Sequence, residues 1–212
     1  MVIEKTPETM PTLTVPYISQ KDDETSNRYG RRGCGLTALR MVLSYYGKDL
    51  GMEELDQLVV ETHAYQPMEG KEEIGGWIHA GMTNIARKVG LRGYRIHYGM
   101  LTEQDLINSK AVFEEEGMGE EEFKDFSESF DQARTEGPMS DLYRLIDKGI
   151  PVIASMKKSY AKTLASHMIV LMGYGGDELV VNDPWEFGPN YKVSVDEFKK
   201  HWTNRVIVIS TP

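Results

Sequence analysis

Cys34 is the only thiol of the 212-residue chain, and the residues around it fit a nucleophile. It follows a polar stretch and stands between Gly33 and Gly35, where a segment with helical periodicity begins. The positive end of a helix dipole favours thiolate over thiol at such a place. The two glycines would let a substrate backbone approach the sulfur, so we assign both to substrate binding. A buried structural cysteine is the alternative interpretation.

A thiolate nucleophile needs an imidazole as its base and a third group that orients the ring. Of the five histidines, His167 differs because it opens an apolar strand-like segment. Asp183 ends the segment that returns from a glycine-rich turn at 175–177. Two strands joined by a tight turn bring their far ends together, so we expect His167 and Asp183 to lie side by side. His79 is expected to be a packing or surface residue, and the other three histidines have no motif.

Two further residues complete the expected site. Gln20 ends an extended segment at 13–19, and a side-chain amide beside a thiol nucleophile can donate to a developing oxyanion. The backbone N–H of Cys34 would be the second donor. We also assign Trp185, which follows Asp183 and Pro184, to substrate binding. Taken alone, Gln20 is equally compatible with an ordinary surface residue.

The elements that must position these residues follow from apolar periodicity and from turn residues. Helices come first and antiparallel strands last, which is typical of an α+β fold. Residues 21–33 are expected to be a loop. We expect helices at 34–46, 52–60, 76–89, 140–148 and 194–202, and strands at 93–98, 150–156, 167–174, 178–182 and 205–210.

An acidic stretch at 102–137 separates the two halves of the chain. It contains two runs of three glutamates and four scattered phenylalanines. We interpret it as amphipathic helix, packed on the core as an insertion within a single domain spanning residues 1–212. A solvated acidic loop is the alternative.

Several blocks together resemble the papain-like cysteine peptidases, most closely the peptidase family 39-like group, which is related to bacteriocin-processing domains that cut after double-glycine leaders. The blocks are VPYISQ at 15–20, GCGLTALRMVLSYYG at 33–47, LIDKGIPVI at 145–153, HMIVLMGY at 167–174, VNDPW at 181–185 and VDEF at 195–198, with Trp202. They span most of the chain in the expected order.

The resemblance implies a papain-like fold and a role for four residues. Gln20 would be the oxyanion glutamine, Cys34 the nucleophile, His167 the base and Asp183 the orienting acid. Cys34 and His167 lie 167 − 34 = 133 positions apart, within the roughly 130–150 of papain-type enzymes. Leu36 stands where the family often has proline, and the acidic stretch leaves the substrate class open. A catalytically silent peptide-binding module and an acyltransferase remain alternatives to a hydrolase acting on a peptide or amide bond.

Composition narrows the partners and the location. The net charge of −9 argues against nucleic-acid binding, which needs clustered basic residues. One cysteine permits no intramolecular disulfide and no cysteine-rich zinc site, and we expect neither metal nor organic cofactor. No apolar run could span a membrane or form a signal-peptide core in residues 1–12. We therefore expect a cytoplasmic protein; the sequence does not define its oligomeric state.

Overall fold

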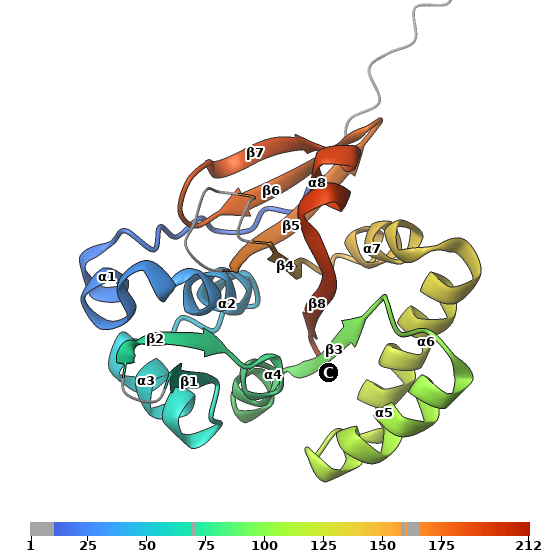
Figure 1. Cartoon of the computed structure of the whole chain (residues 1–212), viewed down its shortest axis with the longest axis horizontal. Helices are drawn as coiled ribbons and strands as arrows, with labels where there is room; N and C mark the ends of the chain where they lie inside the picture. Colours follow the sequence, from blue (N-terminus) through green and yellow to red (C-terminus); the bar gives the residue numbers. More distant parts are fainter. Residues whose placement is uncertain (1–10, 69–70, 158–159, 161–165) are drawn as a thin grey trace, which may run out of the picture.

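A computed structural model describes residues 11–68, 71–157, 160 and 166–212 (Figure 1). Residues 1–10, where a signal-peptide core was sought, lie outside this part. The helices are α1 Asp23–Tyr29, the 3₁₀ turn η1 Gly30–Arg32, α2 Cys34–Tyr45, α3 Met52–Glu61, α4 His79–Lys88, α5 Glu103–Glu115, α6 Glu120–Glu136, α7 Pro138–Asp147 and α8 Val195–His201. The strands are β1 Tyr65–Met68, β2 Lys71–Trp77, β3 Arg92–His97, β4 Val152–Met156, β5 His167–Gly175, β6 Glu178–Asp183, β7 Gly188–Ser194 and β8 Trp202–Ser210.

The centre of the molecule is a six-stranded sheet in the order β3-β8-β4-β5-β6-β7, in which every neighbouring pair is antiparallel. Strand β5 is buried along most of its length because helices cover both faces of the sheet. Its side chains alternate: Met168 and Val170 join the core under α2, α3 and α4, whereas Ile169 and Leu171 join the core under α6, α7 and α8. The expectation of an α+β fold with an antiparallel sheet is confirmed.

The acidic stretch at 102–137 is helical, as expected, but it forms two helices that are joined through Gly117 (φ +78°). Phe126 and Phe130 of α6 are each 2% exposed and pack into the core beside β3. The Glu122 carboxylate accepts a hydrogen bond from the N–H of Gly93 at 2.7 Å and pairs with Arg87 at 3.0 Å. The stretch at 102–137 thus combines an acidic outer face with a buried aromatic face. That the stretch is an insertion stays a prediction.

The first part of the chain departs from expectation in two places. The expected loop at 21–33 contains α1 and η1, because the Asp22 side chain accepts from the N–H of Thr25 at 2.8 Å and so starts a helix with no apolar stripe. The expected helix at 76–89 begins only at His79, since Gly76 and Trp77 belong to the β1–β2 hairpin, which was not expected.

Later elements match more closely. Helix α7 begins at Pro138 after Gly137 and not at Ser140, because proline suits the first helical position. Ser194 does cap α8, accepting from the N–H of Glu197. Strand β7 was not expected, since its glycine, proline and asparagine suggest a turn. The segment at 13–19 is extended without belonging to a strand, and an isolated bridge pairs Thr12, just before it, with Gly173.

Replacing Phe130 with alanine should remove a buried ring that joins α6 to the sheet. We expect the free energy of unfolding to fall by about 3–5 kcal/mol, measured by urea denaturation. Ile107→Ala is the matched control, because Ile107 on neighbouring α5 is 63% exposed. Equal, small effects of the two substitutions would contradict the packing of α6 described above.

Candidate active site

Cys34 is the first residue of α2, and the chain enters this helix directly from the 3₁₀ turn η1. Gly33 has helical dihedral angles (φ −61°, ψ −13°), and its carbonyl accepts from both the N–H and the hydroxyl of Thr37 at 2.9 Å. These bonds fix the first turn of the helix. The Cys34 side chain is 5% exposed. The sulfur is therefore held at the positive end of a twelve-residue helix.

The β5–β6 hairpin brings His167 and Asp183 together. Its turn is short, with β5 ending at Gly175 and β6 starting at Glu178, so the far ends of the two strands are neighbours. His167 Nε2 lies 2.9 Å from Asp183 Oδ1, and the two side chains are 2% and 0% exposed. The same carboxylate oxygen accepts from the N–H of Trp185 at 2.7 Å and of Glu186 at 3.1 Å. These backbone amides thus fix the Asp183 carboxylate, and the carboxylate in turn orients the His167 ring.

His167 and Cys34 line the same cavity, and the Cys34 side chain is one of the groups that act on the charge of the His167 ring. Because Nε2 is engaged by Asp183, the opposite ring nitrogen is the one available to the sulfur. Burial alone lowers the pKa of His167, but the interactions with Asp183 and Cys34 outweigh it and raise the pKa from 6.5 to about 10. The raised pKa therefore favours an imidazolium at His167 at neutral pH.

Gln20 lies next to these residues through backbone pairing. Its N–H donates to the carbonyl of Pro184 at 2.9 Å, directly after Asp183. Its Cβ lies 3.4 Å from the position that a Cβ on Gly33 would take. The side chain is 1% exposed, and within the described part of the chain its Oε1 has no hydrogen-bond partner. Amide oxygens that are buried this deeply usually have a hydrogen-bond partner, so Gln20 Oε1 is an exception among the described residues.

Gly33 and Gly35 have a packing role that was not expected. A Cβ on Gly33 would lie 2.6 Å from Thr25 Cγ2, and a Cβ on Gly35 would lie 2.3 Å from the Trp77 ring. The protein's own side chains therefore occupy the Cβ side of both glycines, and the assignment of these glycines to substrate binding stays a prediction. These glycines allow α1 and β2 to pack against the start of α2.

Trp185 lies outside the pocket that contains Cys34. Its ring is half-buried and stacks under Lys21, whose Nζ is 4.7 Å from the ring centroid. It therefore adjoins the segment of Gln20, and its assignment to substrate binding stays a prediction.

The Cys34 side chain opens into a cavity of about 160 Å³ that also reaches His167. Sequence reasoning missed much of its wall, which includes Gly76 and Trp77 of β2, His79 of α4 and Ser155 of β4. His79 Nε2 lies 2.9 Å from Ser155 Oγ, and burial followed by nearby arginines lowers the pKa of His79 to about 4. His79 directly follows the β1–β2 hairpin, so recognising that hairpin in the sequence would have been needed to place His79 at this cavity.

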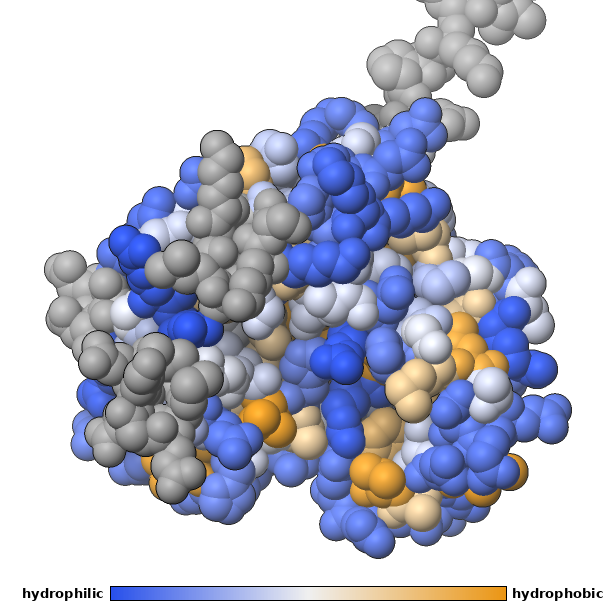
Figure 2. All heavy atoms as spheres, in the orientation of Figure 1, coloured by the Kyte–Doolittle hydropathy of each residue, from blue (hydrophilic) through white to orange (hydrophobic). Residues whose placement is uncertain are grey.

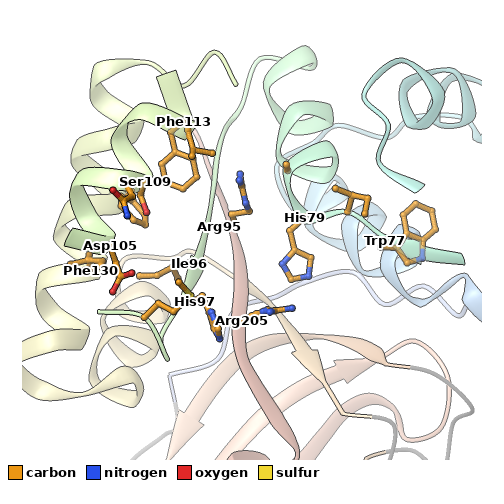
Figure 3. Close-up of a pocket in the computed structure, with 16 residues that line it drawn as sticks. Trp77, His79, Arg95, Ile96, His97, Asp105, Ser109, Phe113, Phe130 and Arg205 are labelled. Carbon is orange, nitrogen blue, oxygen red and sulfur yellow. The ribbon is translucent and has the colours of Figure 1, made fainter. Parts of the chain in front are cut away.

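A second, larger cavity of about 580 Å³ adjoins the first and shares Trp77, His79 and Arg205 with it. It lies between α4, β3 and α5, and Figure 3 shows His79, Arg95 and Arg205 around one space, with Phe113 on the α5 side. In Figure 2 the same face is hollowed between two lobes, with hydrophilic side chains on its floor.

The family follows from comparison with known proteins. The model of the Peptidase_C39 like family matches residues 12–208. The chain belongs to the peptidase C39-like family. Among curated proteins, none matches it.

Solved structures agree on the fold of this C39-like chain. A C39-like peptidase from Bacillus anthracis is 17% identical, with a TM-score of 0.59 over 97% of this chain and 99% of that one. A double glycine motif protease from an AMS/PCAT transporter, in complex with the leader peptide, is 18% identical (TM-score 0.53, 95% and 94% covered). The peptidase domain of Streptococcus ComA is 18% identical, with a TM-score of 0.52 over 92% of this chain and 98% of that one. These likenesses establish the papain-like C39 fold.

Other kinds of site were also sought in this C39-like chain. Within the described residues, no group of three or more histidine, cysteine, aspartate or glutamate side chains could hold a metal ion. In the same part of the chain, no helix is long and apolar enough to cross a membrane.

Asp183→Asn should weaken the interaction that holds His167 charged. We expect the His167 pKa to fall below its value of about 10, measured by NMR titration of the ring nitrogens. A raised folded-state pKa means that the charged ring stabilises the fold fully below pH 6.5, and that this contribution is lost as pH rises through about 10.

Asp177→Asn is the control, because Asp177 is exposed at the turn of the same hairpin. An unchanged His167 titration in Asp183→Asn would show that the carboxylate does not set the charge of the ring.

Proposed function

We propose that this chain is a cysteine peptidase that cleaves a peptide or amide bond through a thioester intermediate. The observation that carries the proposal is the Cys34–His167–Asp183 arrangement at the start of α2. Membership of the C39-like family supports a peptidase, and the neighbour solved with a leader peptide supports a peptide as substrate.

In the proposed mechanism, the Cys34 thiolate attacks the carbonyl carbon of the scissile bond and forms a C–S bond. The charged His167 gives its proton to the leaving nitrogen as the C–N bond breaks. Water then attacks the thioester, and His167 takes a proton from that water. The acid product leaves and the thiolate is restored. Asp183 keeps the ring in orientation during both steps.

Gln20 would stabilise the oxyanion together with the backbone N–H of Cys34. Its buried side chain lies beside Gly33, the residue that precedes Cys34. In the proposed mechanism, the carbonyl oxygen of the scissile bond would lie next to this side chain during attack. The packing of Gly35 against Trp77 holds the start of α2 in place. It would thereby also keep the backbone N–H of Cys34 in position for the oxyanion.

Cleavage can be tested with a peptide library read by mass spectrometry. We expect new peptide ends with the wild-type chain and none with Cys34→Ala, which keeps the helix and removes the sulfur. Undiminished cleavage in Cys34→Ala would refute the assignment of the nucleophile. Peptides retained without cleavage would favour a binding module, and conjugates formed with an added amine would favour acyl transfer.

Gln20→Ala should lower kcat by about 10²–10³ while leaving KM nearly unchanged, because the lost donor acts in the transition state. Steady-state kinetics on a peptide from the library measure this. Asn182→Ala is a control for the buried amides of this region, because Asn182 donates to the Val15 carbonyl at 3.1 Å and has no proposed contact with substrate. An equal loss of kcat in both variants would point to a structural effect instead.

A further inference from the structure

The charges around Cys34 contrast with those of the whole chain. The protein carries a net charge of −9, with 33 acidic and 24 basic residues. The cavity that contains Cys34 is nevertheless lined by Arg32 and Arg205, and none of its lining residues within the described chain is a carboxylate. Asp183, which is bonded to His167, is not among the residues that line this cavity.

The pairing of the arginines follows the same pattern. In the part of the chain that the structure describes, every arginine other than Arg31, Arg32 and Arg205 forms an ion pair with a carboxylate. Arg31 is exposed and does not line the cavity. Among the described residues, the two arginines at the cavity therefore have no carboxylate partner, although the chain has an excess of acids. This is the arrangement expected of a binding site for an anionic ligand.

Arg205 stands where the two cavities meet. It lines both of them, and in Figure 3 its guanidinium points into the space between His79 and His97. Arg95, on the opposite side, is already bound to Glu116 through two hydrogen bonds. In the larger cavity, Asp105 is the one carboxylate among the described lining residues. A substrate that extends from Cys34 into the larger cavity would run along the boundary that Trp77, His79 and Arg205 form.

Arg32 approaches from the other side. It belongs to η1, two residues before Cys34, and its carbonyl accepts a hydrogen bond from Trp77 Nε1. This bond fixes the backbone of Arg32, which is one of the residues that line the cavity. The two guanidinium groups therefore come from elements that are themselves held in place, η1 and β8.

We propose that Arg32 and Arg205 form a specificity site for a carboxylate of the substrate, so that the preferred substrate carries an acidic residue beside the scissile bond. This inference deepens the proposed function and rests on it for the identity of the substrate as a peptide. Because one cavity of about 160 Å³ contains the thiol and both arginines, and an extended residue spans about 3.5 Å, the acidic residue lies within about two positions of the bond that is cut.

The anion preference can be measured without any peptide cleavage. Iodoacetate and iodoacetamide both alkylate a thiolate, and they differ in that only iodoacetate carries a negative charge. The ratio of their rates on Cys34, divided by the ratio on N-acetylcysteine, cancels the nucleophilicity of the sulfur. We expect this ratio to be raised about tenfold in the wild-type chain at low salt and to fall as salt screens the arginines.

The variants separate these two arginines from the general field of the protein. Arg32→Gln and Arg205→Gln should each lower the ratio about three- to tenfold, and Arg205→Lys should retain most of it. Arg31→Gln is the matched control, because it removes the same charge one residue away from Arg32 but outside the cavity. An unchanged ratio in both cavity variants, or an equal fall in Arg31→Gln, would overturn the proposal.

A second measurement identifies the ligand as part of a peptide. Paired peptides with Glu or Gln at each position flanking a cleaved bond should differ about tenfold in kcat/KM in favour of Glu at one position, and Arg205→Gln should abolish the difference. If Gln peptides are cleaved equally well at every position, the proposal is wrong. If no peptide is cleaved at all, the proposed function fails, and the alkylation ratio still decides whether the cavity prefers an anion.

Discussion

The hydrogen bond between His167 and Asp183 is the contact on which the rest of the site depends. It joins two side chains that are almost completely buried, where an unpaired charge would be costly. The carboxylate is held by two backbone amides, and the ring is held by the carboxylate. The β5–β6 hairpin provides the geometry, since its short turn fixes which residues of the two strands are opposite each other. The sheet thus acts as a rigid support for the ring.

Helix α2 has to meet this ring at a fixed point, and tight packing near Cys34 achieves that. Trp77 lies against Gly35, and its indole N–H donates to the carbonyl of Arg32. Tyr29 and Tyr65 pack around the same ring. The first turn of α2 is therefore clamped by aromatic side chains from α1, β1 and β2. A cavity bordered by such rigid elements keeps its shape, with Arg32 and Arg205 among the residues of its wall.

Much of this could be predicted from the sequence, and the reasons for success and failure are physical. The hairpin was recognised because an apolar run, a glycine-rich turn and a second apolar run are local signals, and the turn itself predicts that His167 and Asp183 meet. The helix after Cys34 was recognised from its apolar periodicity. The fold class followed from the order of these elements.

The missed features depend on contacts between distant segments. Helix α1 has no apolar stripe, and its start is set by Asp22. The β1–β2 hairpin contains glycines and glutamates that give no strand pattern, so Trp77 and His79 could not be placed at the cavity. The packing of Thr25 on Gly33 and of Trp77 on Gly35 was not expected, because the sequence does not show which side chain lies opposite a glycine. Arg32 and Arg205 are 173 positions apart, and only the folded chain brings them to one cavity.

The packing of α6 on β3 has a consequence for how the molecule behaves in a crowded solution. Strand β3 ends the sheet, and an unprotected terminal strand offers its backbone to other chains and so promotes aggregation. At Gly93 both backbone groups that face away from the sheet are already occupied, the N–H by Glu122 and the carbonyl by Arg87. Glu122 and Arg87 therefore leave no free backbone group at Gly93 for an incoming strand. In this way the acidic helix α6 also protects the edge of the sheet against aggregation.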